Sequence, residues 1–169
     1  MTISNFKRTT KVFIIVFSLI VIDSYAQETK IVELLNKLLK KEIKKFKNED
    51  SLKIIQPFYI SENKKLILEF EKYNSYNEKW EVIKSEVSLD KITGFIKDIN
   101  VIFLTEEKDV LETIKTYNEK KELISTDKID TNLFFTGINK EQNNTGFRDK
   151  IVKAFQKAGY VIDSQYWYD

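Results

Sequence analysis

The chain has 169 residues, with 28 Lys and Arg against 26 Asp and Glu, 13% aromatic residues, and neither cysteine nor histidine. The absent residue types exclude disulfide bonds, thiol catalysis, Ser-His-Asp triads and zinc sites built from histidine or cysteine. With four glycines and one proline, the composition is typical of a folded domain and not of a disordered chain.

The start of the chain has the layout of a secretory signal peptide. Three basic residues precede an apolar run at residues 12–22, and a small-x-small tripeptide, Ser-Tyr-Ala, ends at Ala26. The apolar run is shorter than the roughly 20 residues of a membrane-spanning helix. We therefore expect residues 1–26 to be cleaved off before Gln27, which leaves a single domain at residues 27–169 without stable insertion in a membrane.

Cleavage of this leader changes the charge of the protein. It removes three basic residues and Asp23, so the 28 basic and 26 acidic residues both fall to 25 and the mature chain is neutral. A neutral chain gives no reason to expect nucleic-acid binding. Gln27 behind the cleavage site, in a chain rich in Lys, Ile, Asn, Phe and Tyr, resembles exported proteins of flavobacteria and their relatives. The resemblance implies the periplasm or the extracellular space and names no activity.

A helix is predicted from residue 28 to about residue 47, because apolar residues recur there at intervals of three and four. They are Ile31, Leu34, Leu35, Leu38, Leu39, Ile43 and Phe46. The neutral mature chain favours a helix that packs on the core over one that lies on a membrane or on nucleic acid.

Alternating patterns after this helix predict the strands of an antiparallel meander. The expected strands are residues 52–60, 65–73, 79–87, 99–105, 110–117, 122–125 and 129–135. Pro57 restricts the first of them to a sheet edge or a bulge. Residues 88–95 carry apolar side chains at three-residue spacing and are expected to form a short helical turn or a compact loop.

The final helix has clear boundary signals. Asn144 or Thr145 can cap its start, and Gly159 follows its last turn. The predicted fold is a single α+β domain, made of an N-terminal amphipathic helix, an antiparallel meander of about six or seven strands, and a C-terminal helix packed on the sheet.

Two phrases within residues 87–158 resemble pleckstrin-homology-type domains. VSLDKITGFIKDINVIFL is similar to their strand, short Leu/Ile turn and next strand, and FRDKIVKAFQKA to their closing helix. The resemblance covers about half of the mature chain and implies a scaffold that binds a ligand or partner. It carries over no phosphate-binding residue.

No catalytic residue, metal site or cofactor is predicted. Three Ser-x-x-Lys pairs fall at expected turns and not inside a helix, where a lysine one turn away could accept the serine proton. The acidic turn at residues 106–109 lacks the spacing of a calcium loop. Paired carboxylates could still hydrolyse a glycan, but the sequence nominates no pair.

The aromatic residues form two candidate binding clusters. Tyr73, Tyr76 and Trp80 flank one expected hairpin, and Tyr166, Trp167 and Tyr168 end the chain. Exposed Tyr and Trp suit stacking on sugars or anchoring a protein interface. The alternative is that Trp80 packs in the core and that the C-terminal cluster covers a sheet edge.

These features favour a small exported, non-enzymatic binding or interaction protein of the periplasm or extracellular space. Inhibitors and immunity-like proteins are one form, since they need only a complementary surface. The expected partner is a protein or a glycan, and the oligomeric state is left open. A carboxylate-dependent glycan hydrolase and a structural cell-envelope protein are the alternatives.

Overall fold

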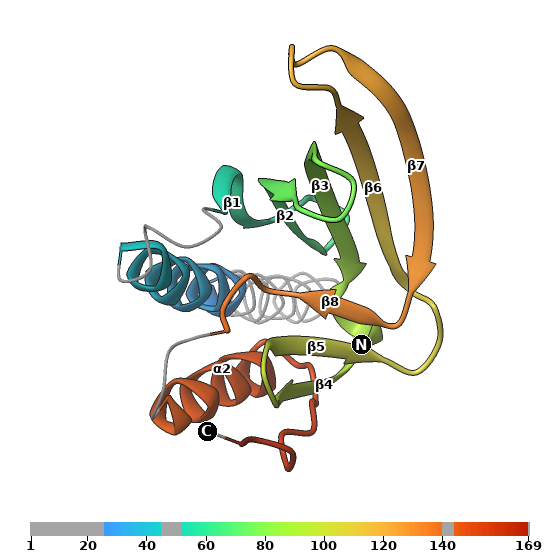
Figure 1. Ribbon diagram of the computed structural model, residues 1–169. Helices are drawn as coiled ribbons and strands as arrows, with labels where there is room; N and C mark the ends of the chain where they lie inside the picture. The colour runs from blue at the N-terminus through green and yellow to red at the C-terminus, as the bar shows by residue number, and fades with distance from the viewer. Residues whose placement is uncertain (1–25, 45–51, 140–143, 169) are drawn as a thin grey trace, which may run out of the picture.

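The computed structural model describes residues 26–44, 52–139 and 144–168 (Figure 1). Residues 26–44 are helical, and the C-terminal helix is α2 (Thr145–Lys157). The described residues between them form eight strands: β1 (Lys53–Ile60), β2 (Lys65–Asn74), β3 (Lys79–Ser88), β4 (Ile92–Lys97), β5 (Val101–Thr105), β6 (Val110–Tyr117), β7 (Leu123–Thr131) and β8 (Leu133–Phe135). The predicted α+β fold is confirmed. The predicted leader up to residue 25 and Phe46 lie outside the described residues.

The strands form two antiparallel sheets. The larger sheet has the order β1-β2-β3-β6-β7, and the smaller sheet has the order β4-β5-β8. A short 3₁₀ turn, η1 (Leu89–Lys91), carries the chain from β3 to β4. The chain returns to the larger sheet after β5 and leaves it again after β7, so interleaved parts of one chain build both sheets.

Two regions depart from the strands expected from sequence. Residues 88–95 were expected to form a short helical turn or a compact loop; the helical turn is present as η1, but the chain enters β4 from Ile92 onward. The β4–β5 ladder shifts register between Ile92 and Gly94, and such a bulge interrupts strand alternation. The expected break at residues 126–128 is also wrong, because β7 runs through it and the chain breaks at Asn132 instead.

The helix at residues 26–44 packs its predicted apolar face into the core, as the burial of Ile31 and Leu35 shows. Asn36 ties this helix to β1: its Nδ2 donates to the Phe58 carbonyl at 2.8 Å, and its Oδ1 accepts the Phe58 N–H at 2.9 Å. The β1–β2 ladder shifts register around Pro57. Asn36 therefore supplies hydrogen-bond partners for the backbone of an irregular stretch, where unpaired groups would be costly.

Buried phenylalanines connect the sheets to α2. Phe58 of β1 lies 6.3 Å from Phe134 of β8, and Phe134 lies 6.2 Å from Phe103 of β5, measured between ring centroids. Phe103 in turn contacts Phe155 of α2 at 5.5 Å and stacks on Phe95 of β4 at 4.6 Å. The C-terminal helix thus packs on the smaller sheet.

The boundaries of α2 match the sequence signals in position. Asn144 precedes the helix, and Gly159 follows it with φ of 93°, a conformation that favours glycine. The Asn144 side chain makes no cap hydrogen bond. Its Oδ1 instead accepts the indole N–H of Trp167 at 3.0 Å, so Asn144 anchors the end of the chain.

Candidate functional site

The larger sheet has an inner face, buried in the core, and an outer face. Side chains alternate along each strand, so the inner face of β2 carries Leu66, Leu68 and Phe70. The register places Phe70 opposite Ile83 of β3, and Ile83 opposite Ile114 of β6. Figure 1 shows β6 and β7 as a long curved hairpin that extends beyond the core. We call residues 110–131 the β6–β7 hairpin.

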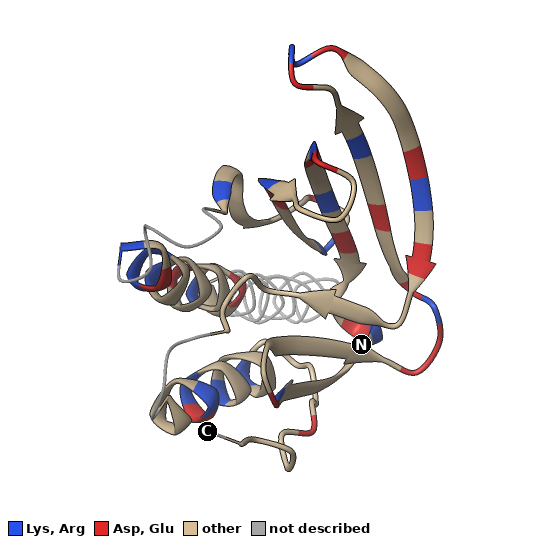
Figure 2. Ribbon diagram, viewed as in Figure 1, with Lys and Arg blue, Asp and Glu red and all other residues tan. Residues whose placement is uncertain are grey.

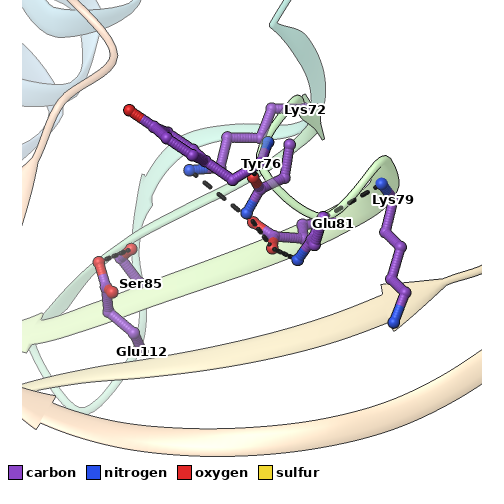
Figure 3. Close-up of polar contacts among 8 residues, drawn as sticks. Lys72, Tyr76, Lys79, Glu81, Ser85 and Glu112 are labelled. Carbon is purple, nitrogen blue, oxygen red and sulfur yellow. Dashed lines mark hydrogen bonds and ion pairs between the residues drawn. The ribbon is translucent and has the colours of Figure 1, made fainter.

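The inner face becomes polar toward the turn between β2 and β3 (Figure 3). Glu81 accepts hydrogen bonds from the side-chain amides of Asn74 at 2.7 Å and Asn77 at 3.4 Å, and the Lys72 ammonium lies 3.9 Å away. The side-chain oxygen of Asn74 accepts the backbone N–H of Tyr76. These contacts brace the turn, so the buried carboxylate of Glu81 has a structural role.

Glu112 of β6 lies on the same face, opposite Ser85 of β3. The Ser85 hydroxyl donates to the Glu112 carboxylate at 3.3 Å (Figure 3). Burial raises the pKa of Glu112, and the Ser85 hydrogen bond and the charge of Lys72 offset this in part. A carboxyl group that keeps its proton more readily can act as a general acid. The other buried carboxylate on this face, Glu81, is already bound by two side-chain amides and an ammonium group.

An aromatic cluster occupies the outer face of the larger sheet. Tyr73 and Trp80 are opposite each other, with ring centroids 5.3 Å apart and an interplanar angle of 62°, and Tyr117 is opposite Trp80 on the other side. The Lys121 ammonium lies 3.7 Å from the centroid of the Trp80 ring and also donates to Glu71. This hydrogen bond lowers the pKa of Glu71. We call Tyr73, Trp80, Tyr117 and Lys121 the outer cluster.

The remaining predicted site residues lie elsewhere. Tyr76, at the β2–β3 turn, is fully exposed. Tyr166, Trp167 and Tyr168 lie along β4 of the smaller sheet, where the Lys97 N–H donates to the Tyr166 carbonyl and the Tyr168 N–H donates to the Lys97 carbonyl, both at 2.9 Å. The structure therefore brings Tyr73 and Trp80 together but keeps the two predicted clusters on different sheets.

Trp167 differs from its neighbours. Its ring packs 5.1 Å from Phe95 and belongs to the edge of the core, whereas the Tyr166 and Tyr168 side chains are 58% and 59% exposed. The C-terminal segment thus covers the free edge of β4, and its two tyrosines point to solvent.

The β6–β7 hairpin exposes apolar side chains that the core does not use. Leu123, Ile124 and Ile129 of β7 are 56%, 50% and 47% exposed. Most other side chains of β7 are exposed as well. Leu123 lies opposite Tyr117 of the outer face, whereas Ile129 lies opposite Glu112 of the inner face, so the exposed apolar side chains are on both faces of β7.

A separate cavity of about 260 Å³ lies between the helix at residues 26–44 and the β1–β2 turn. Glu28, 3% exposed, pairs there with Lys64 at 2.6 Å and accepts a hydrogen bond from the Tyr160 hydroxyl at 3.4 Å. Burial and the charge of Glu28 raise the pKa of Tyr160 to about 12. The ion pair with Lys64 compensates the charge of the buried Glu28 carboxylate.

Acidic side chains are spread over the described ranges, residues 26–44, 52–139 and 144–168. Within these ranges no three acidic side chains gather as metal ligands would. None of the described helices is long and apolar enough to cross a membrane.

Sequence reasoning missed Tyr117, Lys121 and the apolar residues of β7 as surface candidates. Tyr117 ends the alternating pattern of β6, but its place beside Trp80 depends on which strands pair. Lys121 has a positive φ of 61° in the turn after β6, and its ammonium lies over the Trp80 ring. The sequence signal available was the run of apolar residues at the start of β7.

Comparison with protein-family models, with curated proteins and with solved structures found no match for this chain. The local features implied by the pleckstrin-homology resemblance are present, since Val87–Leu104 forms strand, turn and strands, and Phe147–Ala158 lies mostly in α2. These features do not assign the chain to that family, since no family model matches it.

Proposed function

We propose that the protein is an exported, non-enzymatic binding protein of the periplasm or extracellular space, and that its β6–β7 hairpin is the interaction surface. The observation that carries the proposal is the exposure of Leu123, Ile124 and Ile129 on a strand that extends beyond the core. Apolar side chains outside the core contribute little to folding, whereas they gain from burial against a partner.

The outer cluster supports a protein partner over a glycan. Stacking on a sugar needs an open ring face, but Lys121 covers one face of Trp80 and Tyr73 contacts it edge-on. A packed patch of Tyr, Trp and Lys beside exposed aliphatic residues is instead typical of a protein interface.

Affinity capture from periplasmic and culture fractions tests this proposal. We expect the wild-type protein to retain one partner in stoichiometric amounts, and Ile124→Asp to lose it, because a charge on the hairpin would be buried without a partner. Val161→Asp is the matched control, since Val161 is 87% exposed and lies after α2, away from the hairpin.

Two results would contradict the proposal. One is the absence of any specific partner in either fraction. The other is a partner that Ile124→Asp and Val161→Asp retain equally well.

Export is a separate part of the proposal and rests on the leader sequence. The mass and N-terminal sequence of the exported protein should identify Gln27 as its first residue. A secreted form that still carries residues 1–26, or a protein found only inside the cell, would contradict it.

A further inference from the structure

The free edge of β7 is exceptional among the strand edges of the described chain. At the opposite edge of the larger sheet, β1 contains Pro57 and two register shifts. In the smaller sheet, residues 163–168 hydrogen-bond to the edge of β4, and β8 has three residues. Bulges, proline, charged side chains, covering segments and short strands are the usual means of blocking an edge.

β7 has only one such protection, the charges of Asp127, Lys128 and Asp130, and these oppose pairing only in registers that bring like charges together. It has nine residues without proline or glycine, and its ladder with β6 is regular until the turn, where it shifts between Thr116 and Tyr117. No described element lies beyond it in Figure 1. One row of its backbone N–H and C=O groups is thus available to another strand.

We infer that two copies of the chain associate through antiparallel pairing of β7 with β7. This inference rests on the proposed function, because it names a second copy as a partner of the same hairpin. The twofold axis of such a pair stands perpendicular to the sheet, so one residue of β7 lies opposite its own counterpart and the others pair symmetrically about it.

The charges on β7 select the register (Figure 2). Centring the pair on Asp127 or on Lys128 would place like charges directly opposite each other, which is destabilising. Centring it on Ile129 places Ile129 opposite Ile129 and Lys128 opposite Asp130 of the second copy, twice by symmetry. Among the residues of β7, centres at Ser125 and Thr126 also avoid like charges but form no opposite-charge pair. The charge pattern therefore favours the register centred on Ile129.

Pairing in this register would join the two larger sheets into one continuous sheet. The perpendicular axis leaves both outer faces on the same side, so two copies of the outer cluster face the same way. A bivalent surface of this kind binds a repeated or dimeric partner more tightly than one copy does.

Sedimentation velocity and light scattering of the protein in its natural processed form test the inference. We expect a concentration-dependent dimer. Lys128→Glu and Asp130→Lys should each raise its dissociation constant by about tenfold or more, because each change opposes like charges twice. The double variant, and an equimolar mixture of the two single variants, should restore association, since both recreate the opposite-charge pairs.

Lys150→Glu is the control for a general effect of charge, because Lys150 is exposed on α2. It should leave the dissociation constant unchanged, and unfolding curves should show that all variants fold. A wild-type protein that stays monomeric at every concentration, or single variants that dimerise as wild type does, would overturn the inference.

These outcomes separate the inference from the proposed function. A monomer that loses a captured partner on Ile124→Asp overturns self-association and leaves the proposed function standing. A charge-dependent dimer without any captured partner supports self-association and contradicts the proposed heterologous binding.

Discussion

Glu28 shows how a single buried charge connects distant parts of the chain. Its carboxylate pairs with Lys64 and accepts the hydroxyl of Tyr160, so it joins the helix at residues 26–44 to the β1–β2 turn and to the segment after α2. Removing one partner of a buried pair leaves the other uncompensated. Glu28 is therefore a residue of the fold, although it lines a cavity.

The ionisation of Tyr160 reports on this contact. Its pKa is raised to about 12, first by burial and second by the charge of Glu28. Because the unfolded chain loses this proton near pH 10, stability should fall as the pH rises from about 10 to about 12. Glu28→Gln should lower the pKa of Tyr160 without restoring its ordinary value, since burial remains.

NMR titration of ring-labelled tyrosine measures that pKa directly. Glu62→Gln is the matched control, because Glu62 lines the same cavity and is exposed. An unchanged Tyr160 titration in Glu28→Gln would contradict the assigned contact.

Glu112 and Glu71 should respond to pH in opposite ways. Burial raises the pKa of Glu112, so the folded protein holds that proton more tightly and loses stability as the pH rises through the carboxyl range. Glu112→Gln should therefore stabilise the protein at pH 7, by less than about 1 kcal/mol because solvent screens a half-buried charge. The difference should vanish in acid.

Glu71 provides the comparison of opposite sign. The hydrogen bond from Lys121 lowers its pKa, so its contribution to stability is present above the ordinary carboxyl pKa and is lost as the pH falls. Glu71→Gln should destabilise the protein at pH 7 and have no effect in acid. Denaturant unfolding at both pH values gives the change in unfolding free energy for Glu112→Gln and Glu71→Gln. Changes of the same sign at pH 7 would contradict the opposite pKa shifts of the two residues.

At the level of single residues, the sequence predicted part of the candidate site. Tyr73 and Trp80 were expected to flank one hairpin, and the ten-residue β2–β3 ladder places them side by side. Tyr117 and Lys121 could not be assigned, because the pairing of β6 with β3 skips two intervening strands in the sequence. The local sequence pattern of a strand does not indicate which distant strand pairs with it.

At the level of elements, Asn36 should be essential for the attachment of the N-terminal helix to β1. It makes both a donor and an acceptor contact with the Phe58 backbone. Asn36→Ala should lower the free energy of unfolding by about 2 kcal/mol, because it leaves two backbone groups without these partners. Lys37→Ala, at the next and exposed position, should have little effect in the same unfolding experiment. Equal losses for the two variants would show that the contact is unimportant.

The C-terminal segment should stabilise the smaller sheet through Trp167. Trp167→Ala removes the contact with Phe95 and the hydrogen bond to Asn144, and should cost about 3 kcal/mol, as large-to-small changes near a core do. Tyr168→Ala should cost less than about 1 kcal/mol, since its side chain faces solvent. A melting temperature that falls equally in both variants would contradict the distinct role of Trp167.

The elements that the sequence predicted well are those in which apolar residues recur at regular intervals without interruption. β2 alternates cleanly, and both helices carry their apolar faces at helical spacing. β4 was missed because a bulge gives Ile92 and Phe95 a three-residue spacing. β7 was divided because its polar centre, residues 126–128, is held in the strand by pairing with β6.

At the level of the whole molecule, the division into two sheets is a tertiary property. The chain passes from one sheet to the other at η1, after β5 and after β7, and each passage looks like an ordinary turn in the sequence. The aromatic contacts from Phe58 to Phe155 hold the two sheets and α2 together. The β6–β7 hairpin lies beyond these contacts, which leaves its far end free for interaction.

The unfolding free energy of a triple variant, Leu123→Thr, Ile124→Thr and Ile129→Thr, tests this division between core and interaction surface most directly. Threonine keeps the preference for strand while it removes the exposed apolar groups. Measured at a dilution where the chains do not associate, the variant should be within about 1 kcal/mol of wild type, as surface changes usually are. A loss of several kcal/mol would show that these side chains belong to the core, and would contradict the proposal that the hairpin is kept for binding.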